Sequence, residues 1–527
     1  MTREHWDAVV IGSGFGGSTI ALKLAAAGIR VLVLERGRWV DRDDTAWDSR
    51  AIQIDRKYKS QTAYEVDERW GRQLTYPDDS VGGKSVFYGA ASLRLREEDF
   101  DSAARFDRSA IERLPPMDWP IQYSDLEPFY SEAERELGVA GVSGADPTDP
   151  PRTSDYPTRP PSYGSSARRI ARAAERLGLN PFPIPLAINF EGDGSRPKCV
   201  KCMTCDLFPC KICAKNDLAV TVLPKAQQFG AVVRGSTIVK RLLRSDGRVR
   251  AVECVGADTG EEFTISCELC VVSCGAIASA SLLLNSGLEE VEPNGRLVGR
   301  YLMRHCSGII VGIFPFTTNP ERQFNKQLAV TDFYRGHPKR GPKGPWGMIQ
   351  SLQTPPPEFV EETAPYPKPI GWLGARTLPL HAYLICMAED LPNFDNRVEI
   401  TRQQTDPFGV PLARVFHKYY KRDLEARRGL YVEAARILRK AGSLIRVRMP
   451  IHTYSHALGT LRFGTDPESA VLDRWCRFFG VPNLFVVDGS FMPTSGGVNP
   501  SLTIAANGLR VGKYLAENWD DVIRREV

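Results

Sequence analysis

The sequence has no long apolar run and no marked excess of either charge. No apolar stretch approaches the roughly 20 residues that a membrane-spanning helix needs, so we expect no membrane span. The formal net charge is only +5, and Lys and Arg are interspersed with Asp and Glu along the chain. Because nucleic-acid-binding proteins gather basic residues into one patch, we expect no nucleic-acid partner.

The N-terminal residues lack the charged and apolar segments of a secretory signal, since residues 1–7 lead directly into an apolar strand. We find no internal repeat and no low-complexity tract. A chain of 527 residues is too long for one hydrophobic core, so two or more domains are expected. Together these features predict a multidomain cytoplasmic protein.

A dinucleotide-binding unit occupies residues 7–37. An apolar strand leads into Gly12-Ser13-Gly14-Phe15-Gly16-Gly17, which satisfies the G-x-G-x-x-G pattern, and a helical segment follows. Gly12 permits the tight turn, Gly14 lets the backbone approach a pyrophosphate, and Gly17 allows close packing of helix and strand. Glu35 ends the next strand, where its carboxylate can accept hydrogen bonds from ribose hydroxyls. An acid at this position favours an unphosphorylated ribose, and therefore FAD or NAD.

A second glycine-rich loop lies at residues 80–89 and includes Gly82 and Gly83. It is either a plain loop or backbone that passes close to a flat ligand, because the two glycines remove side chains from such an approach.

Changes in composition and in the alternation of apolar residues along the rest of the chain indicate an α/β fold with a second domain. Residues 231–243 and 249–265 alternate like hairpin or meander strands, with turns at 245–247 and 258–260, and 269–273 predicts a separate buried strand. Residues 307–454 are rich in aromatics and prolines and predict an antiparallel sheet with helices. One long amphipathic helix is expected at 421–441, and proline-rich loops are expected at 341–370. The expected organisation is a Rossmann-like dinucleotide-binding domain built from 1–110, 199–306 and 455–527, cap and connecting segments at 111–198, and a substrate-binding domain at 307–454.

Six ordered motifs resemble the glucose–methanol–choline (GMC) family of flavin oxidoreductases over nearly the full length of the chain. They are the opening unit, Val81-Gly82-Gly83-Lys84-Ser85, the segment 275–288 with Ala280 where proline or serine is usual, Asp395-Asn396-Arg397-Val398, His456-Ala457-Leu458-Gly459-Thr460, and the segment from Val487-Asp488-Gly489 to Asn499-Pro500. Within the family the chain is most similar to the bacterial sugar and gluconate dehydrogenase branch. The resemblance implies the GMC fold, with FAD as the cofactor.

The resemblance also implies which residues contact FAD. Glu35 would bind the adenosine ribose, the backbone of Val239 would lie near the adenine, and Asp488 would lie near the ribityl chain. The full expected set is Gly12, Gly14, Phe15, Gly17, Glu35, Arg36, Gly82, Gly83, Ser85, Val239, Cys274, Asp488, Gly489, Asn499 and Pro500. Family members that attach flavin covalently carry histidine just after the Gly-Gly loop, whereas Phe87 and Tyr88 stand here, so we expect noncovalent FAD.

Oxidation of an alcohol requires a base for the hydroxyl proton and a polar group that fixes the oxygen. In the family, the base is the histidine of the His-x-x-Gly-Thr segment, which is His456 here, and its partner is Asn499. An imidazole titrates near neutrality, and an amide can donate to a forming oxyanion. His456 could instead be a structural histidine. Asn499 could act as the N-cap of the last helix, with Pro500 as its first residue, and also as a catalytic group.

Five of the 12 cysteines fall between Cys199 and Cys213, with the spacing C-x2-C-x2-C-x4-C-x2-C. Cys199, Cys202, Cys205 and Cys210 approximate an iron–sulfur pattern, although ferredoxins have three residues before the fourth cysteine. Zinc or disulfides are alternatives, as are unbridged structural thiols. The other seven cysteines are more typical of buried, small apolar residues.

The sequence therefore predicts an FAD-dependent enzyme that oxidises an alcohol to a carbonyl, with a sugar, polyol or glycoside as the substrate. The electron acceptor would be oxygen or an acceptor protein. A sterol or long-chain alcohol oxidase is the alternative within the family. A noncatalytic or lyase-like flavin protein is the alternative outside it, and the presence of both His456 and Asn499 argues against that class.

Overall fold

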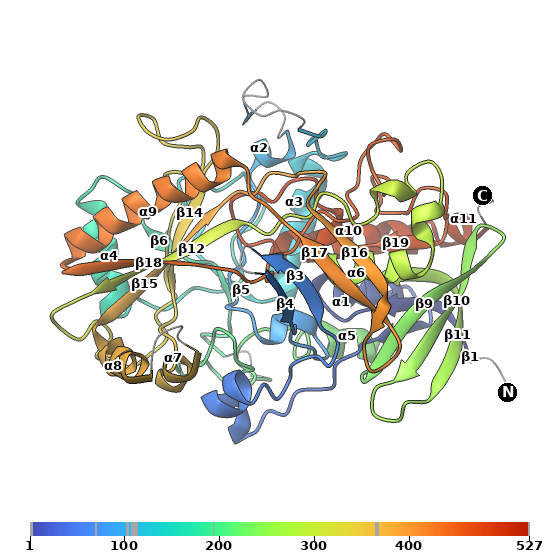
Figure 1. The fold of residues 1–527 in the computed structure, drawn as a ribbon, viewed down its shortest axis with the longest axis horizontal. Coiled ribbons are helices and arrows are strands. Elements are labelled where there is room, and N and C mark those ends of the chain that lie inside the picture. The colour runs from blue at the N-terminus through green and yellow to red at the C-terminus, as the bar shows by residue number, and fades with distance from the viewer. Residues whose placement is uncertain are drawn as a thin grey trace.

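The computed structural model describes residues 4–68, 71–101, 105–106, 114–192, 194–363 and 368–524. A seven-stranded sheet lies at the right of Figure 1 and a six-stranded sheet at the left. The seven-stranded sheet has the order β8-β2-β1-β11-β10-β9, and β19 pairs with β11 outside this path. Its strands are β1 (Glu4–Ile11), β2 (Val31–Leu34), β8 (Val232–Arg234), β9 (Thr237–Ser245), β10 (Arg248–Gly256), β11 (Glu262–Val272) and β19 (Leu484–Val486).

Strand β11 unites two strands that the sequence predicts as separate. The turn predicted at 258–260 lies between β10 and β11, but the prediction of a separate strand at 269–273 is wrong, because β11 runs without interruption from Glu262 to Val272. The first half of β11 pairs antiparallel with β10, whereas the second half pairs parallel with β19. The sequence therefore changes from alternating to continuously apolar within one strand, because the neighbouring strand changes there.

Four helices pack together beside this sheet, and two of them come from opposite ends of the chain. They are α1 (Phe15–Ala26), α10 (Ser501–Glu517), α3 (Tyr123–Glu136) and α5 (Val222–Gln228). The Tyr130 hydroxyl of α3 hydrogen-bonds the Thr503 hydroxyl of α10 over 2.7 Å. A Cβ on Gly508 of α10 would lie 2.2 Å from Oγ1 of Thr19, so this glycine lets α10 approach α1 closely. Helices α2 (Glu97–Phe100), α6 (Ala276–Asn285) and α11 (Trp519–Arg524) complete this part of the molecule.

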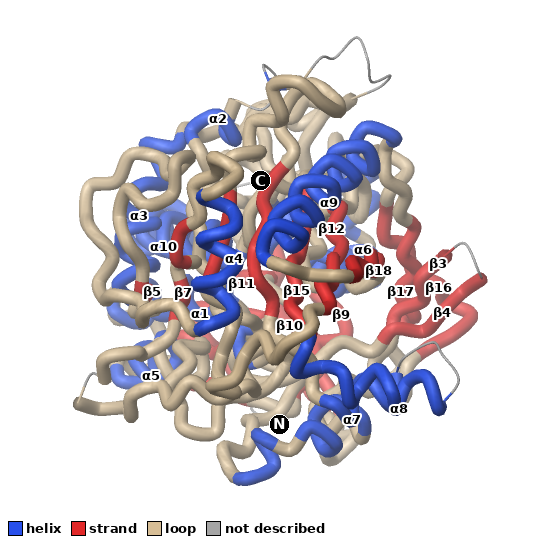
Figure 2. The backbone as a smooth tube through the Cα atoms, turned by 90° about the vertical axis from the view of Figure 1, so that its left-hand side faces the viewer, coloured by secondary structure: helices blue, strands red, loops and turns tan. Residues whose placement is uncertain are grey.

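The six-stranded sheet has the order β18-β12-β15-β14-β13-β6. Its strands are β6 (Phe182–Pro183), β12 (Cys306–Ile313), β13 (Leu328–Val330), β14 (Gly347–Leu352), β15 (His381–Ala388) and β18 (Ile445–Pro450). Helices α9 (Lys421–Ala441) and α4 (Ser165–Glu175) cover one face, and Figure 2 shows α9 lying across β12 and β15. The long helix has the bounds that the sequence predicts.

Residues 341–370, predicted as proline-rich loops, include regular elements, so that prediction is wrong. They contain β14, all of α7 (Pro357–Thr363) and the start of α8 (Lys368–Thr377). Pro357 is the first residue of α7, a position where proline costs no hydrogen bond. The prolines here therefore start helices and bound a strand, which sequence texture alone does not separate from loops.

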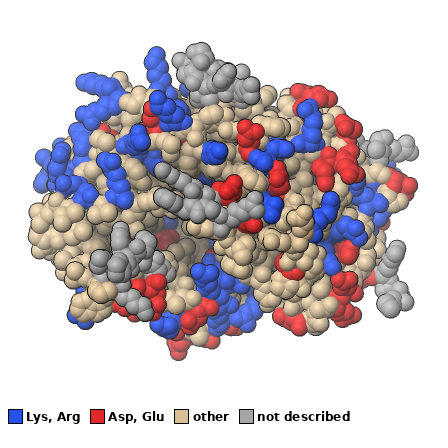
Figure 3. Space-filling model, viewed as in Figure 1, with Lys and Arg blue, Asp and Glu red and all other residues tan. Residues whose placement is uncertain are grey.

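Two smaller sheets join segments that lie far apart in the sequence. Strands β16 (Arg397–Thr405), β17 (Pro411–Phe416), β3 (Tyr64–Glu68) and β4 (Gly71–Thr75) form one sheet in that order, and β5 (Val139–Ala140) pairs with β7 (Leu186–Ala187). Figure 3 shows both signs of charge intermixed over one face of the molecule. Within the described residues, every helix is too short or too polar to cross a membrane.

Candidate active site

The glycines between β1 and α1 form a close-packed turn with one open position. Gly12 has φ +96°, and a Cβ there would lie 2.3 Å from the Ser273 carbonyl oxygen, while a Cβ on Gly17 would lie 1.9 Å from the Gly12 carbonyl oxygen. Both positions therefore require glycine for the reasons that the motif predicts. A Cβ on Gly14 would come no closer than 3.9 Å to the atoms around it, so packing does not explain this glycine. Close approach of the pyrophosphate, which the motif predicts at this position, would explain it.

The start of α1 suits the phosphates of a dinucleotide. In α1, which lies wholly within the described residues, no side chain caps the first turn and no acidic residue occupies it. Its free N–H groups and the positive end of the helix dipole can therefore serve an anion. These features fit FAD, with the pyrophosphate at Gly14 and Phe15.

The Gly82–Ser85 loop lies directly on this turn. The Gly82 N–H donates to the Ser13 hydroxyl over 2.8 Å, and this hydroxyl in turn donates to the Glu35 carboxylate over 2.7 Å. A Cβ on Gly83 would lie 3.0 Å from Gly14 Cα. The three segments predicted to hold the cofactor therefore meet. Burial raises the pKa of Glu35, and hydrogen bonds from Ser13 oppose that rise.

Other predicted cofactor residues surround the same region. The Ser85 hydroxyl donates to the Gly82 carbonyl over 2.6 Å, so it shapes the loop. Phe15 packs on Tyr88 with ring centroids 5.4 Å apart, and Arg36 pairs with Asp79 at 2.6 Å. Val239 is half-buried on β9. The contacts of all these residues with FAD stay predictions.

The C-terminal segment is attached to the start of α6 by Asp488. Its carboxylate accepts from the backbone N–H of Gly275 and of Ser490, each over 2.9 Å, and burial raises its pKa. Gly489 follows directly in the chain, and a Cβ there would lie 2.7 Å from Leu458. The Cys274 thiol, whose pKa burial raises to about 12, donates to the Ile11 carbonyl over 3.3 Å. Strand β1, the start of α6 and the last segment therefore converge at one edge of the sheet.

His456 meets a second histidine that the sequence analysis did not select. Its Nδ1 lies 2.9 Å from Nδ1 of His305, which directly precedes β12. His305 Nε2 lies 3.1 Å from the Ser495 carbonyl oxygen and 3.0 Å from that of Gly496. His305 thus bridges His456 to the segment that carries Asn499. The catalytic roles of His456 and Asn499 stay predictions.

The environment keeps His456 neutral. Burial is the largest cause that lowers its pKa well below the usual value. The positive charges of Lys326 and Lys84, and that of His305 whenever its ring is protonated, lower it further. A neutral imidazole can accept a proton at neutral pH, as the predicted role requires.

Asn499 does not cap the last helix, so that prediction is wrong. Helix α10 begins at Ser501, Pro500 occupies the N-cap position, and no side chain caps α10 over its described length. The Asn499 side chain contacts the six-stranded sheet, where its Oδ1 accepts from Nε2 of Gln350 on β14 over 3.4 Å. This hydrogen bond leaves the Nδ2 donor of Asn499 for another group, because an amide presents its acceptor and its donors on different atoms.

His305, Gln350 and Lys326 are the residues that sequence reasoning missed. Gln350 is a buried polar residue that directly follows the apolar Met348 and Ile349 on β14, which is a usable signal. Lys326 pairs with Asp206 of the cysteine-rich segment at 3.0 Å, and its charge reaches His456. No local sequence pattern indicates the ion pair between Lys326 and Asp206 or the contact between His305 and His456.

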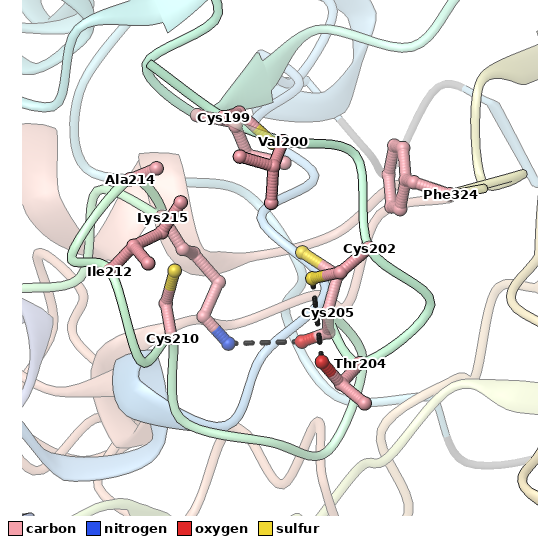
Figure 4. A pocket seen from close by; sticks show the side chains of 11 residues that line it. Cys199, Val200, Cys202, Thr204, Cys205, Cys210, Ile212, Ala214, Lys215 and Phe324 are labelled. Carbon is pink, nitrogen blue, oxygen red and sulfur yellow. Dashed lines mark hydrogen bonds between the residues drawn. The ribbon is translucent and has the colours of Figure 1, made fainter. Parts of the chain in front are cut away.

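Four of the clustered cysteines line one pocket. Figure 4 shows Cys199, Cys202, Cys205 and Cys210 around it, together with Lys215, whose ammonium donates to the carbonyl groups of Tyr88, Cys205 and Phe208. Burial raises the pKa of Cys199 to about 11 and raises that of Cys205 as well. Among the residues that the structure describes, no group of three or more His, Cys, Asp or Glu side chains could hold a metal ion as they stand. The donor set fits a metal, but its arrangement is not preformed.

The fold and this site define a flavin-dependent oxidoreductase with a dinucleotide-binding domain and a second, six-stranded sheet. The chain belongs to the GMC oxidoreductase family, whose N-terminal model matches residues 7–307 and whose C-terminal model matches residues 392–508. This membership confirms the predicted α/β GMC fold, FAD as cofactor, and the enzyme class, an oxidoreductase that acts on CH–OH groups.

Two curated relatives align with almost the whole chain. It is 32% identical to 6'''-hydroxyparomomycin C oxidase of Streptomyces lividus, over 97% of this chain and 92% of the relative. It is 31% identical to paromamine 6'-oxidase of Streptomyces fradiae, over 97% of this chain and 91% of the relative. Among solved structures, pyridoxine 4-oxidase from Mesorbium loti has the same fold, with a TM-score of 0.69 at 18% identity over 98% of this chain and 99% of that chain.

Proposed function

We propose that the protein oxidises a hydroxyl group of a sugar, polyol or glycoside to a carbonyl, with His456 as the base and Asn499 as the donor to the substrate oxygen. The single observation that carries the proposal is the cluster in which His305 joins His456 to the Ser495–Asn499 segment. The two relatives, named as oxidases of hydroxyparomomycin C and of paromamine, support the substrate class.

The residues divide the chemistry between them. The hydroxyl proton of the substrate passes to the imidazole of His456, and the Nδ2 donor of Asn499 stabilises the negative charge that forms on the oxygen. Bound FAD supplies the acceptor for the hydride. Gln350 orients the Asn499 amide by donating to its Oδ1.

A panel of alcohols tests this function. We expect anaerobic addition of sugars, polyols or glycosides to bleach the bound flavin in a stopped-flow experiment, and sterols of the same concentration to leave it yellow. Bleaching by sterols alone would contradict this substrate class and indicate a sterol or long-chain alcohol oxidase instead. Absence of bleaching by every alcohol would contradict a role in alcohol oxidation.

We also propose that FAD is held without a covalent bond. Phe87 is buried against Tyr58 with ring centroids 5.9 Å apart, and the Tyr88 hydroxyl donates to the Asn216 carbonyl over 3.0 Å. Both residues that follow the Gly-Gly loop are thus committed to the protein's own packing. Acid precipitation should release all of the flavin into the supernatant, and flavin retained in the pellet would refute this mode of binding.

We further propose that the thiol pocket binds an iron–sulfur cluster through Cys199, Cys202, Cys205 and Cys210. All twelve cysteines, each of them among the described residues, carry free thiols. Such a group would supply a one-electron carrier near the substrate site, since the Asp206–Lys326 ion pair links this segment to the surroundings of His456. The acceptor would then be a protein rather than oxygen, and free thiols favour a reducing, cytoplasmic location.

Elemental analysis of anaerobically prepared protein should find iron and acid-labile sulfide. Cys205→Ser should lose most of this iron, whereas Cys213→Ser, a matched change outside the pocket lining, should keep it. One zinc per chain, or no metal together with rapid hydrogen peroxide formation, would leave the pocket a structural feature. Recovery of active enzyme from an oxidising compartment on cell fractionation would contradict the proposed location.

A further inference from the structure

His305 is held more tightly than an ordinary core histidine. Its side chain is 1% exposed, and its backbone has φ +59°, a left-handed conformation that non-glycine residues rarely adopt. Its carbonyl oxygen accepts from the Ser307 N–H over 2.9 Å and from the Tyr419 hydroxyl over 3.0 Å. Backbone strain of this kind is concentrated at functional sites.

The hydrogen bonds of the His305 ring determine where its proton lies. The two groups at Nε2 are carbonyl oxygens, which only accept, so Nε2 must carry the hydrogen. Burial lowers the pKa of His305 and keeps the ring neutral, although the nearby Asp390 opposes this effect. A neutral imidazole has one N–H, so Nδ1 of His305 presents a lone pair.

The hydrogen bond between the two rings then determines the tautomer of His456. Its Nδ1 lies 2.9 Å from the His305 lone pair and must donate to it. The second nitrogen of His456, Nε2, is therefore the atom without a hydrogen. Within the described ranges, Nε2 has no hydrogen-bond partner, so its lone pair is available to a substrate.

We propose that His305 is a positioning residue, which holds His456 in the Nδ1–H tautomer and thereby makes Nε2 the atom that takes the alcohol proton. This inference rests on the proposed function of His456 as the base. When Nε2 gains the proton, the resulting imidazolium keeps its Nδ1–H bond to His305. Lys326 and Lys84 are the other charged groups that face His456, and Asp390 is the one that faces His305.

Nitrogen NMR of the holoenzyme labelled with 15N-histidine reads the tautomers directly, because the chain has only seven histidines to assign. We expect His456 in the Nδ1–H form and His305 in the Nε2–H form. His305→Gln should keep the His456 tautomer, because a glutamine amide can also donate to the carbonyl groups and accept from His456. His305→Leu should lose it. An Nε2–H tautomer of His456 in the wild-type protein would overturn the proposal.

Kinetics supply the second readout. His305→Leu should slow flavin reduction at saturating substrate by about 10- to 100-fold, the loss that follows removal of a hydrogen bond orienting a functional histidine, with the substrate concentration for half-saturation little changed. His305→Gln should keep most of the rate, because the glutamine amide can make the same hydrogen bonds to His456 and to the two carbonyl groups. His381→Leu, at a buried histidine bonded to Tyr383, is the matched control and should leave the rate unchanged.

The outcomes separate the two proposals. A normal rate in His456→Ala would refute the function of His456 itself. Slow reduction in His456→Ala together with a normal rate and tautomer in His305→Leu would refute only the positioning role. If His305→Leu fails to fold, the His456 tautomer in the wild-type protein and in His305→Gln still decides the question.

Discussion

His456→Ala should slow reduction of the bound flavin by about 10²–10⁴-fold, the range that a general base contributes, while FAD stays bound. Alanine leaves no group to take the hydroxyl proton from the substrate. The residues that fit the cofactor belong to other segments, in particular the Gly12–Gly17 turn and the Gly82–Ser85 loop. Stopped-flow absorbance under anaerobic conditions measures the reduction, and the flavin content of the purified variant checks the binding.

The pH dependence sharpens this expectation. Burial holds the pKa of His456 well below its usual 6.5. The wild-type rate should therefore stay constant through pH 6.5 and fall only at the lower pH at which this imidazole becomes protonated. His456→Ala should lose this acid limb. A variant with a near-normal rate and an unchanged limb would show that another residue takes the proton. His452→Ala, close by in the chain, is the control, and we expect it to keep both.

Asn499→Ala should slow flavin reduction by about 10²–10³-fold, as loss of one oxyanion donor does in other enzymes. The Nδ2 donor is the free side of this amide, because its Oδ1 already accepts from Gln350. Asn499→Asp should be at least as slow, since a carboxylate offers a negative charge where a donor is needed. Asn518→Ala, at the other end of α10, should reduce flavin normally.

Thermal unfolding of Asn499→Ala gives an independent check. If Asn499 capped α10, its loss would destabilise the helix by about 1 kcal/mol. Since Pro500 holds the N-cap position instead, we expect the melting temperature to stay near that of the wild-type protein. A normal rate with a clearly lowered melting temperature would make Asn499 a structural residue.

The sequence predicts well those features that depend on neighbouring residues. The Gly12–Gly17 turn and the helix at 421–441 follow from local spacing and periodicity, and the structure has them where expected. The spacing of the cysteines also predicts a shared location, and four of them line one pocket. Spacing does not determine what the thiols bind, because iron, zinc and plain packing tolerate similar intervals.

Features that depend on distant partners could not be predicted. His305 and His456 are 151 positions apart, and no pattern around Arg304-His305-Cys306 signals their contact. The expected cap at Asn499 failed because Gln350, from another domain of the sequence, competes for that side chain. Local patterns divide strand β11 in two, because its two halves pair with different neighbouring strands.

The order of strands in the dinucleotide-binding sheet has a consequence for synthesis of the chain. Strand β11 pairs with β1 from the start of the sequence and with β19 near its end, and α10 packs on α1. A ribosome therefore releases the Gly12–Gly17 turn long before the segments that support it exist. Closing such long loops is slow and leaves apolar strands exposed meanwhile. The cofactor cradle is thus completed last, and the apolar edge of β11 that pairs with β19 stays uncovered until residues 484–486 emerge.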